Sequence, residues 1–306
     1  MGEAVNEAGE LRDYFTVKEV AEYLHLNEKK IYALVKDGAI PATKAAGKWL
    51  FPRKLVDEWL LESAHGGVLT DRLVIAGSDD PLLAAAVAQL ASQMGASALV
   101  TLSPTGTRLG LALLAQRRAH VAAIHWGPAA AADRRHPQLA RSYPTHRGWM
   151  LVRLARREQG ILLGPAVAGA TGLETLVKPG IRWALRQEGA GSQHFLETQL
   201  TQRGLTLPED LITARALSER HAAALIAQGQ ADCAPGVHGA AGEFGLAFLP
   251  LGWECFDLVL PRSVYFRRLF QDFLEVLRGS EMAAVAAALK GYDLEPLGRI
   301  LPIPED

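Results

Sequence analysis

Apolar residues recur with a helical period near the N-terminus. The first apolar stripe consists of Val17, Val20, Ala21 and Leu24. Thr16 precedes this stripe, and Glu19 follows Thr16 by three residues, which is the spacing of a capping box at a helix start. A turn at residues 25–27 follows, in which Asn27 can cap a second helix that ends at Gly38. The pattern predicts two short helices joined by a tight turn, a helix-turn-helix.

Two short extended runs follow the second helix. They are residues 40–43 and 49–51, and the glycine-containing stretch 44–48 lies between them as a hairpin loop. Pro52 then precedes a third predicted helix at residues 53–62. Because a hairpin after a helix-turn-helix is a wing, residues 13–62 are predicted to form a winged helix-turn-helix domain.

Basic residues gather in the second half of this domain. Between Lys29 and Lys54 there are seven lysines and arginines but one acidic residue, Asp37. The whole chain has a formal net charge of -1, so any attraction to DNA must come from such a local patch. The basic residues fall on the second helix, the wing and the start of the third helix, which can reach phosphates or groove edges. An ordinary solvated lysine face is the alternative interpretation.

Three segments of this domain resemble the excisionase-type winged helix of the MerR superfamily in order and spacing. They are residues 14–21, 31–41 and 47–51. The resemblance implies that the second helix enters the major groove of double-stranded DNA and that the wing follows the backbone. The DNA contacts that it implies are Asn27, Lys29, Lys30, Tyr32, Lys44, Lys48 and Arg53.

A break in composition at residues 63–71 predicts a short linker to a second domain, residues 72–306. In that domain β-like runs alternate with helical stretches, which is typical of an α/β fold with parallel connections. The predicted strands are residues 73–76, 98–102, 121–124, 149–154, 181–185 and 231–234. The predicted helices are residues 81–94, 108–118, 193–203, 219–229 and 264–290, the last broken near Gly279. The charge-free stretch 81–107 is interpreted as a buried helix and a strand, not as a membrane span.

Three predicted strand-to-helix junctions are rich in glycine and hydroxyl residues, at positions 77–80, 103–107 and 188–192. Such junctions aim backbone N–H groups and hydroxyls at the positive end of a helix, which is how anion pockets are built. We predict one shared pocket at the carboxyl ends of the strands, whereas plain helix capping by Asp80 and Ser192 is the alternative. The predicted ligand-binding residues are Ser78, Ser103, Thr105, Gly106, Thr107, His125, Gly191 and Ser192.

The second domain resembles a type II periplasmic-binding-protein fold, in the cytosolic branch fused to excisionase-type heads. The resemblance is carried by residues 76–81, 114–116 with 123–125, 186–192 and 256–259. It implies two lobes that close over a ligand, and several members of this branch look like molybdate or tungstate binders. Related sequences carry Gly-Ser-Gly-Thr-Arg where residues 189–193 read Gly-Ala-Gly-Ser-Gln, so a partner for a carboxylate is missing. Neutral N–H and O–H donors can still hold an oxyanion, whereas His125 and Trp126 would favour a flat organic ligand.

The sequence therefore predicts a cytoplasmic one-component transcriptional regulator that binds DNA and responds to a molybdate- or tungstate-type oxyanion. A small organic effector is the alternative. Paired half-sites in DNA lead us to expect a homodimer. The acidic N-terminus is unlike a signal peptide, and motifs of catalysis or of zinc binding are absent from the sequence, so no metal, cofactor or enzymatic activity is expected. The two cysteines read as buried free thiols, although a DNA-tethered enzyme that uses Cys233 with His238 stays an alternative.

Overall fold

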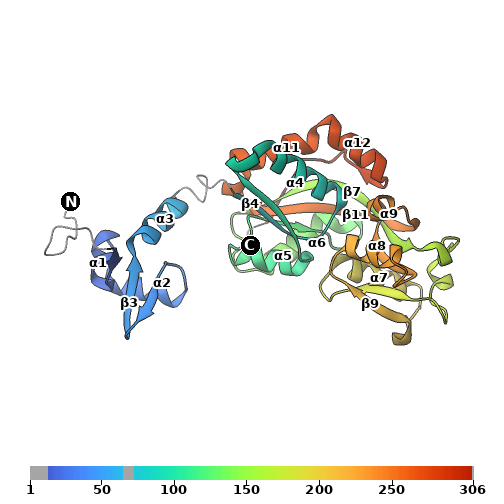
Figure 1. Ribbon diagram of the computed structural model, residues 1–306, viewed down its shortest axis with the longest axis horizontal. Helices are drawn as coiled ribbons and strands as arrows, with labels where there is room; N and C mark the ends of the chain where they lie inside the picture. Colours follow the sequence, from blue (N-terminus) through green and yellow to red (C-terminus); the bar gives the residue numbers. More distant parts are fainter. Residues whose placement is uncertain (1–12, 65–71, 305–306) are drawn as a thin grey trace. The chain divides into compact units, whose positions relative to one another are not determined.

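The structure is a computed structural model that describes residues 13–64 and 72–304. The chain divides into two compact units, Met1–Thr70 and Asp71–Asp306 (Figure 1). The last helix of the first unit extends to Ala64, two residues beyond its predicted end. The rest of the predicted linker, residues 65–71, lies outside the described residues.

The first unit is a helix-turn-helix with a small three-stranded sheet. Its elements are β1 (Tyr14–Phe15), α1 (Val17–Tyr23), α2 (Glu28–Lys36), β2 (Thr43–Ala45), β3 (Lys48–Pro52) and α3 (Arg53–Ala64). The predicted capping box is confirmed, because the Thr16 hydroxyl accepts from the N–H of Glu19 and the Glu19 carboxylate accepts from the N–H of Thr16. A core that includes Ile31, Phe51 and Val56 joins α2, the wing and α3.

The wing is tighter than the sequence pattern suggested. The first strand was expected at residues 40–43, but β2 begins only at Thr43. Pro41 explains part of this shift, because proline has no N–H to contribute to a strand ladder. Ala46 (φ 47°) and Gly47 (φ 80°) both adopt left-handed conformations, so a two-residue turn closes the hairpin where a five-residue loop was predicted.

The second unit is built on a mixed sheet of ten strands within the described residues. The strands are β4 (Arg72–Gly77), β5 (Leu99–Pro104), β6 (Val121–Ile124), β7 (Trp149–Leu163), β8 (Trp183–Arg186), β9 (Ile212–Ala216), β10 (Cys233–Val237), β11 (Ala247–Pro261), β12 (Tyr292–Asp293) and β13 (Ile300–Pro302). Their order is β5-β4-β6-β11-β7-β10-β8-β9, and β12 and β13 also pair with β7. The predicted parallel connections occur in β5-β4-β6 and in β9-β8-β10. The strands β7 and β11 are instead antiparallel to their neighbours.

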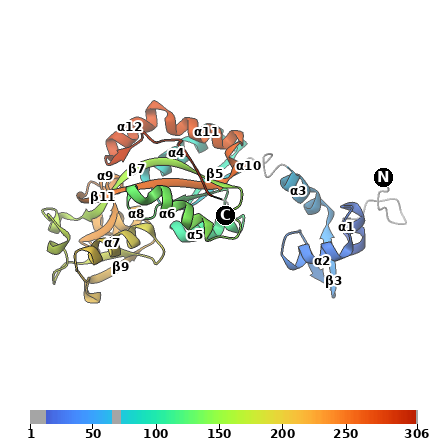
Figure 2. The same cartoon turned by 180° about the vertical axis from the view of Figure 1, so that it is seen from behind.

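The helices cover the sheet in two lobes that β7 and β11 connect (Figures 1 and 2). The first lobe contains α4 (Pro81–Met94), α5 (Thr107–Ala115), α6 (Ala129–Arg141), α10 (Arg262–Tyr265), α11 (Arg268–Arg278) and α12 (Ser280–Leu289). The second lobe contains α7 (Gly191–Gln202), α8 (Glu219–Ala227) and α9 (His238–Phe244). At one end β11 pairs with β6, and at the other β7 pairs with β10, so both long strands run through both lobes. Sequence analysis missed α6, α9, β9, β11, β12 and β13, and it found only the first six residues of β7.

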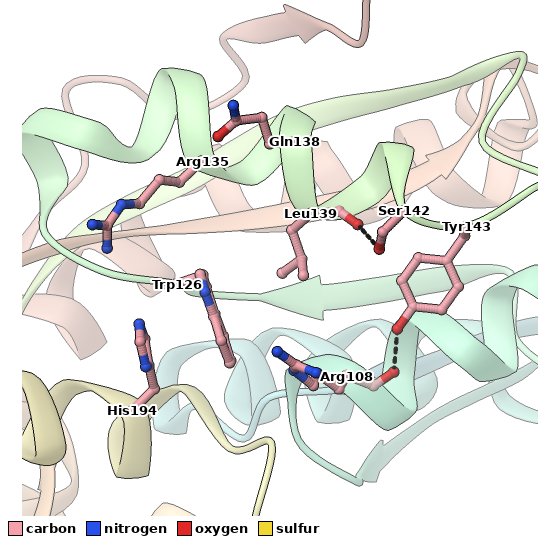
Figure 3. A pocket seen from close by; sticks show the side chains of 8 residues that line it. All are labelled: Arg108, Trp126, Arg135, Gln138, Leu139, Ser142, Tyr143 and His194. Carbon is pink, nitrogen blue, oxygen red and sulfur yellow. Dashed lines mark hydrogen bonds between the residues drawn. The ribbon is translucent and has the colours of Figure 1, made fainter.

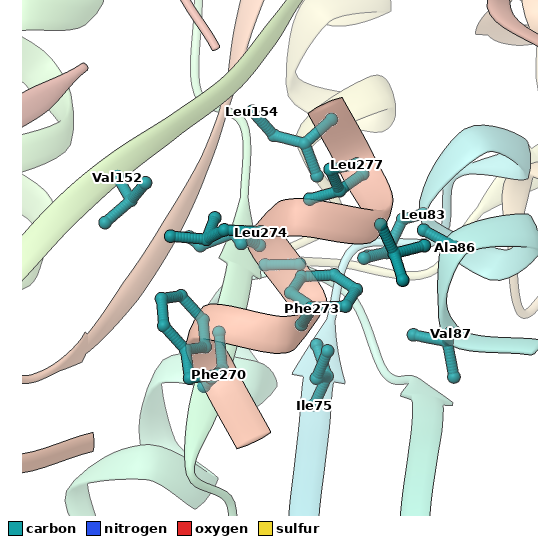
Figure 4. Packing of buried hydrophobic residues seen from close by; sticks show 14 of the residues in the cluster. Ile75, Leu83, Ala86, Val87, Val152, Leu154, Phe270, Phe273, Leu274 and Leu277 are labelled. Atoms are coloured by element: carbon teal, nitrogen blue, oxygen red, sulfur yellow. The ribbon is translucent and has the colours of Figure 1, made fainter. Parts of the chain in front are cut away.

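The core of the first lobe lies between α11, α4 and the sheet (Figure 4). Phe273 and Leu277 of α11 pack in the same buried cluster as Leu83 of α4 and Ile75 of β4. The predicted break near Gly279 is confirmed, since Gly279 adopts an extended conformation between α11 and α12. The charge-free stretch is α4 followed by β5, as predicted. Among the described residues, the helices are too short or too polar to cross a membrane.

Candidate functional site

The exposed basic surface of the first unit lies on α2 and the wing. Six of the seven predicted DNA contacts are exposed, namely Asn27, Lys29, Lys30, Tyr32, Lys44 and Lys48. Asn27 also caps α2, because its Oδ1 accepts from the N–H of Lys30 at 2.8 Å. Arg53 is only half-exposed, and its guanidinium lies 5.8 Å from the centroid of the Phe15 ring. Arg53 and Asn27 therefore have structural contacts in addition to their predicted role, whereas Lys29 and Lys30 project into solvent.

Three of the predicted ligand residues meet at the carboxyl ends of the first lobe's strands. Ser78 follows β4, Thr107 begins α5 and His125 follows β6, and all three are buried. The hydroxyls of Ser78 and Thr107 lie 2.8 Å apart. The Thr107 hydroxyl donates to the carbonyl of His125 at 3.1 Å, and it accepts from the N–H of His125 at 3.3 Å. These contacts fix the backbone of His125 at the end of β6.

The remaining predicted residues of that junction have other positions. The Thr105 hydroxyl accepts from the N–H of Gly77 at 3.1 Å, and Gly106 donates to the carbonyl of Gly77 at 2.8 Å. Both contacts set the entry of the chain into α5. Ser103 is exposed on the edge strand β5, outside the buried cluster.

The start of α7 brings the second lobe against His125. A Cβ atom at Gly191 would lie 2.5 Å from the Cε1 of His125, so the close contact requires glycine at this position. Ala190, not Ser192, is the N-cap of α7, so the alternative interpretation in which Ser192 caps this helix is wrong. The Ser192 hydroxyl is buried, and it has no hydrogen-bond partner in the described part of the chain.

A buried arginine that the sequence pattern did not identify holds the acidic residues of this site. Arg157 of β7 donates to Glu254 and to Asp80, each at 2.8 Å, and its Nη2 lies 3.5 Å from Glu219. The Glu254 carboxylate also pairs with the Nδ1 of His125 at 2.7 Å. Burial alone would raise the pKa of Glu254, but His125 and Arg157 lower this pKa overall. Burial raises the pKa of Glu219, whose partners compensate its charge less completely.

The two aspartates beside Ser78 are engaged in structural contacts. Asp80 caps α4, because its Oδ1 accepts from the N–H of Leu83 at 2.8 Å. Its Oδ2 accepts from the hydroxyl of Tyr292 at 2.8 Å. Asp79 accepts from the N–H of Arg220 at 3.2 Å, which links the first lobe to α8.

A second buried arginine, Arg186, lies near position 193, where the resemblance led us to expect an arginine. Arg186 ends β8, and its N–H donates to the Oε1 of Gln193 at 3.1 Å. Its Nη2 donates to the carbonyl of Leu217 at 3.1 Å. Its Nη1 is buried and lacks a hydrogen-bond partner among residues 13–64 and 72–304. The sequence analysis placed Arg186 in the segment 186–192 that carries the family resemblance, just after the predicted strand 181–185, but it did not name Arg186 as a ligand-binding residue.

Both lobes line a groove of about 550 Å³ that includes Trp126, the residue after His125 (Figure 3). Its lining residues are Arg108, Trp126, Arg135, Gln138, Leu139, Ser142, Tyr143 and His194. Trp126 of the first lobe stacks on His194 of the second, with ring centroids 4.4 Å apart and an interplanar angle of 9°. The guanidinium of Arg108 lies 5.1 Å from the centroid of the Trp126 ring. Guanidinium and aromatic groups together suit a planar or anionic part of a ligand.

The two cysteines are free and buried. Burial raises the pKa of the Cys233 thiol, which keeps it protonated near neutral pH. The Nδ1 of His238 pairs with Glu158 at 2.7 Å, and its ring stacks on Phe248. These contacts do not favour Cys233 and His238 as a nucleophile and base.

Solved structures of other proteins share the fold of this chain. A phosphate-type ABC transporter substrate-binding protein from Clostridium perfringens, solved with bound phosphate, superposes with a TM-score of 0.51 at 10% identity, covering 73% of this chain and 100% of that one. A cysteine mutant of OxyR from Corynebacterium glutamicum superposes with a TM-score of 0.51 at 14% identity, covering 89% of this chain and 90% of that one. Such low identities show a shared fold alone.

Similarity in sequence gives the same division of the chain. The uncharacterized protein YvgK of Bacillus subtilis is 28% identical over 132 residues, which are 42% of this chain and 42% of that protein. The chain therefore matches less than half the length of this relative. Residues 14–64 match a helix-turn-helix domain, and residues 88–278 match the PBP superfamily domain. The predicted α/β architecture, a winged helix-turn-helix joined to a periplasmic-binding-protein-like domain, is thus confirmed, and the chain belongs to the PBP superfamily.

Proposed function

We propose that this protein is a one-component transcriptional regulator, in which the N-terminal domain binds double-stranded DNA and the two-lobed domain binds a small effector. The observation that carries the proposal is the meeting of buried, partly unpartnered polar groups from both lobes around His125, in a chain that also has a helix-turn-helix. Polar groups buried without partners cost stability, so a ligand that pairs them would favour the closed arrangement of the lobes.

We further propose that the effector carries an anionic group. The N-termini of α5 and α7, the Ser192 hydroxyl and the guanidinium of Arg186 supply hydrogen-bond donors for such a group. Molybdate and tungstate are the first candidates, because small oxyanions fit donor-rich helix starts. A small organic anion is the second candidate, favoured by the stacked rings of Trp126 and His194 at the adjacent groove.

The N-terminal winged helix-turn-helix domain, called the head below (residues 13–64), is proposed to bind DNA in the manner of the excisionase-type winged helices of the MerR superfamily. Helix α2 would enter the major groove with Lys29, Lys30 and Tyr32, and the wing would contact the backbone through Lys44 and Lys48. A homodimer on paired half-sites and a cytoplasmic location follow from this role as parts of the same proposal.

The proposal is tested by measuring DNA affinity of the full-length protein with and without effector candidates. Fluorescence anisotropy on the DNA upstream of its own gene would use molybdate, tungstate, phosphate and a panel of small metabolites. We expect at least one candidate to raise the melting temperature and to change the DNA affinity about 5- to 150-fold, the usual range of allosteric coupling. Unchanged melting temperature and DNA affinity across the whole panel would refute the sensing role.

A further inference from the structure

Three buried polar atoms of complementary chemistry lie at the end of β8, the start of α7 and the start of α8. They are the Nη1 of Arg186, the Oγ of Ser192 and the Oε2 of Glu219, and none has a hydrogen-bond partner within the described residues. The three residues are only 2%, 1% and 2% exposed. Buried polar atoms nearly always have a hydrogen-bond partner, so three buried atoms without one in the same site point to a ligand that would pair with them.

Close contacts bring these three residues into one site. The Nε2 of His125 lies 3.4 Å from the Oε1 of Glu219, and the same nitrogen would lie 2.6 Å from a Cβ at Gly191, next to Ser192. The backbone N–H of Arg186 donates to Gln193 on α7, and its Nη2 donates to the carbonyl of Leu217, two residues before Glu219. The guanidinium of Arg186 therefore lies beside the start of α8, and its backbone contacts the start of α7.

The unpaired atoms include both hydrogen-bond donors and an acceptor, so the ligand needs both an acceptor group and a donor group. Arg186 and Ser192 offer N–H and O–H donors, which a carboxylate accepts well. Glu219 offers a carboxylate oxygen, which needs a donor, because its other oxygen already faces Arg157 and His125. A ligand made only of acceptor oxygens, such as molybdate or tungstate, would leave Glu219 unpartnered and would place negative charge beside it.

The charges around the site favour the same conclusion. Four buried carboxylates, those of Asp79, Asp80, Glu219 and Glu254, face Arg157, Arg186, Arg220 and the imidazole of His125. A dianion would add two negative charges beside these carboxylates, whereas a group that is cationic beside Glu219 and anionic beside Arg186 would add no net charge.

We propose that the effector is a small amino carboxylate, whose carboxylate binds Arg186 and Ser192 and whose ammonium group binds Glu219. This inference rests on the proposed function and chooses its organic candidate over its oxyanion candidate. The groove accommodates the rest of the molecule, because Trp126 directly follows His125 and His194 lies two residues after Ser192. The aromatic lining suits a planar or apolar side chain on the ligand.

Matched ligands on the unaltered full-length protein test the proposal without any risk of misfolding. Calorimetric titration would compare the natural α-amino acids, the carboxylic acid that lacks each amino group, the amine that lacks each carboxylate, phosphate, molybdate and tungstate. We expect at least one amino acid to bind and the loss of either group to weaken binding roughly 10- to 100-fold, as for buried charge-assisted hydrogen bonds. Tighter binding of molybdate, tungstate or phosphate than of any amino acid would overturn the proposal.

A pair of variants locates the ammonium site. Glu219→Gln should weaken binding of the amino acid roughly 10- to 100-fold but change the affinity of its des-amino analogue far less. Glu209→Gln, on an exposed residue of the same lobe, should change neither. Equal loss for both ligands in Glu219→Gln would overturn the assignment of the ammonium group. Measuring DNA affinity in the same samples distinguishes the identity of the ligand from the proposed regulation. An amino acid that binds without altering DNA affinity would refute the proposed regulation but would agree with the assigned ligand.

Discussion

The two units of this protein place their charged residues in opposite ways. In the head, Lys29, Lys30 and Lys48 project from α2 and the wing into solvent. In the two-lobed domain, Arg157 and Glu254 are completely buried on the long strands β7 and β11. Exposed charges cost little to maintain and can attract a polyanion, whereas buried charges persist only when partners surround them. The head therefore suits an interaction with a large external partner. The two-lobed domain suits a small ligand that is enclosed by buried charged side chains.

The largest effect is expected where a buried charge is removed. Arg157→Met leaves the carboxylates of Asp80 and Glu254 without their guanidinium partner, so we expect a loss of about 3–5 kcal/mol in the free energy of unfolding of the two-lobed domain. Urea titration followed by tryptophan fluorescence measures this loss. Arg156→Met is the matched control: Arg156 is the next residue, is 45% exposed and pairs with Asp293, so its loss should cost less than about 1 kcal/mol. Similar costs for both variants would contradict the partner network around Arg157.

The next effect concerns the exposed charges of the head. Lys29→Glu with Lys30→Glu should weaken specific DNA binding more than about 100-fold, because two phosphate or base contacts become repulsive. Lys178→Glu with Arg215→Glu makes the same change in net charge on exposed residues of the second lobe, and it should leave DNA affinity within about threefold if the patch is local. Anisotropy titrations at two salt concentrations measure both. Normal binding by the Lys29 and Lys30 variant would refute the proposed DNA surface.

The same contrast explains which features the sequence could predict. The capping box of Thr16 and Glu19 joins residues three positions apart, and it is confirmed as predicted. Arg157 instead contacts Asp80 and Glu254, 77 and 97 positions away. The residues around Arg156 and Arg157 form a polar run in the sequence, and such a run does not predict a buried strand. In the structure this run lies in β7, where the charge of the buried Arg157 is compensated only by residues that are distant in the sequence.

The residues of the candidate site also differ in whether local sequence could identify them. Sequence analysis named Ser78 and Thr107 because each lies at a recognisable strand-to-helix junction, and it named His125 as a residue that could line the predicted pocket. Glu219 was not found, because an acidic residue at the start of a helix ordinarily interacts with the helix dipole alone. Its role became visible only when the fold placed it 3.4 Å from His125 of the other lobe.

A smaller effect is expected from one methyl group between the lobes. Gly191→Ala places a Cβ about 2.5 Å from the imidazole of His125, so the lobes can no longer approach fully. We expect effector affinity to fall roughly 10- to 100-fold, while DNA affinity without effector stays within about twofold, because the head is untouched. Gly169→Ala is the control, since a Cβ there meets open space. Calorimetry with whichever effector is found gives the result, and equal affinities in the two variants would mean that the lobes do not close at this contact.

The smallest effect is a pH dependence of stability that comes from one buried histidine of the first lobe. Burial, with help from Arg267 and Arg72, lowers the pKa of His120 to about 4, and its Nδ1 accepts a hydrogen bond from Val74 at 2.9 Å. The imidazole is therefore neutral in the folded protein, so its contribution to stability is complete above about pH 6.5 and is lost as the pH falls toward 4.

His120→Asn keeps an acceptor for Val74 but removes this titration. Between pH 7 and pH 4.5 the unaltered protein should lose about 1 kcal/mol more unfolding free energy than the variant, a value reduced for the partial exposure of the ring. His25→Asn replaces an exposed histidine at a left-handed position of the head, which asparagine tolerates, so this control should leave the free energy of unfolding at pH 7 nearly unchanged. Urea titrations at several pH values measure the stability profiles of the unaltered protein and of His120→Asn. A His120→Asn profile that runs parallel to that of the unaltered protein would show that the buried imidazole is not what couples the first lobe to pH.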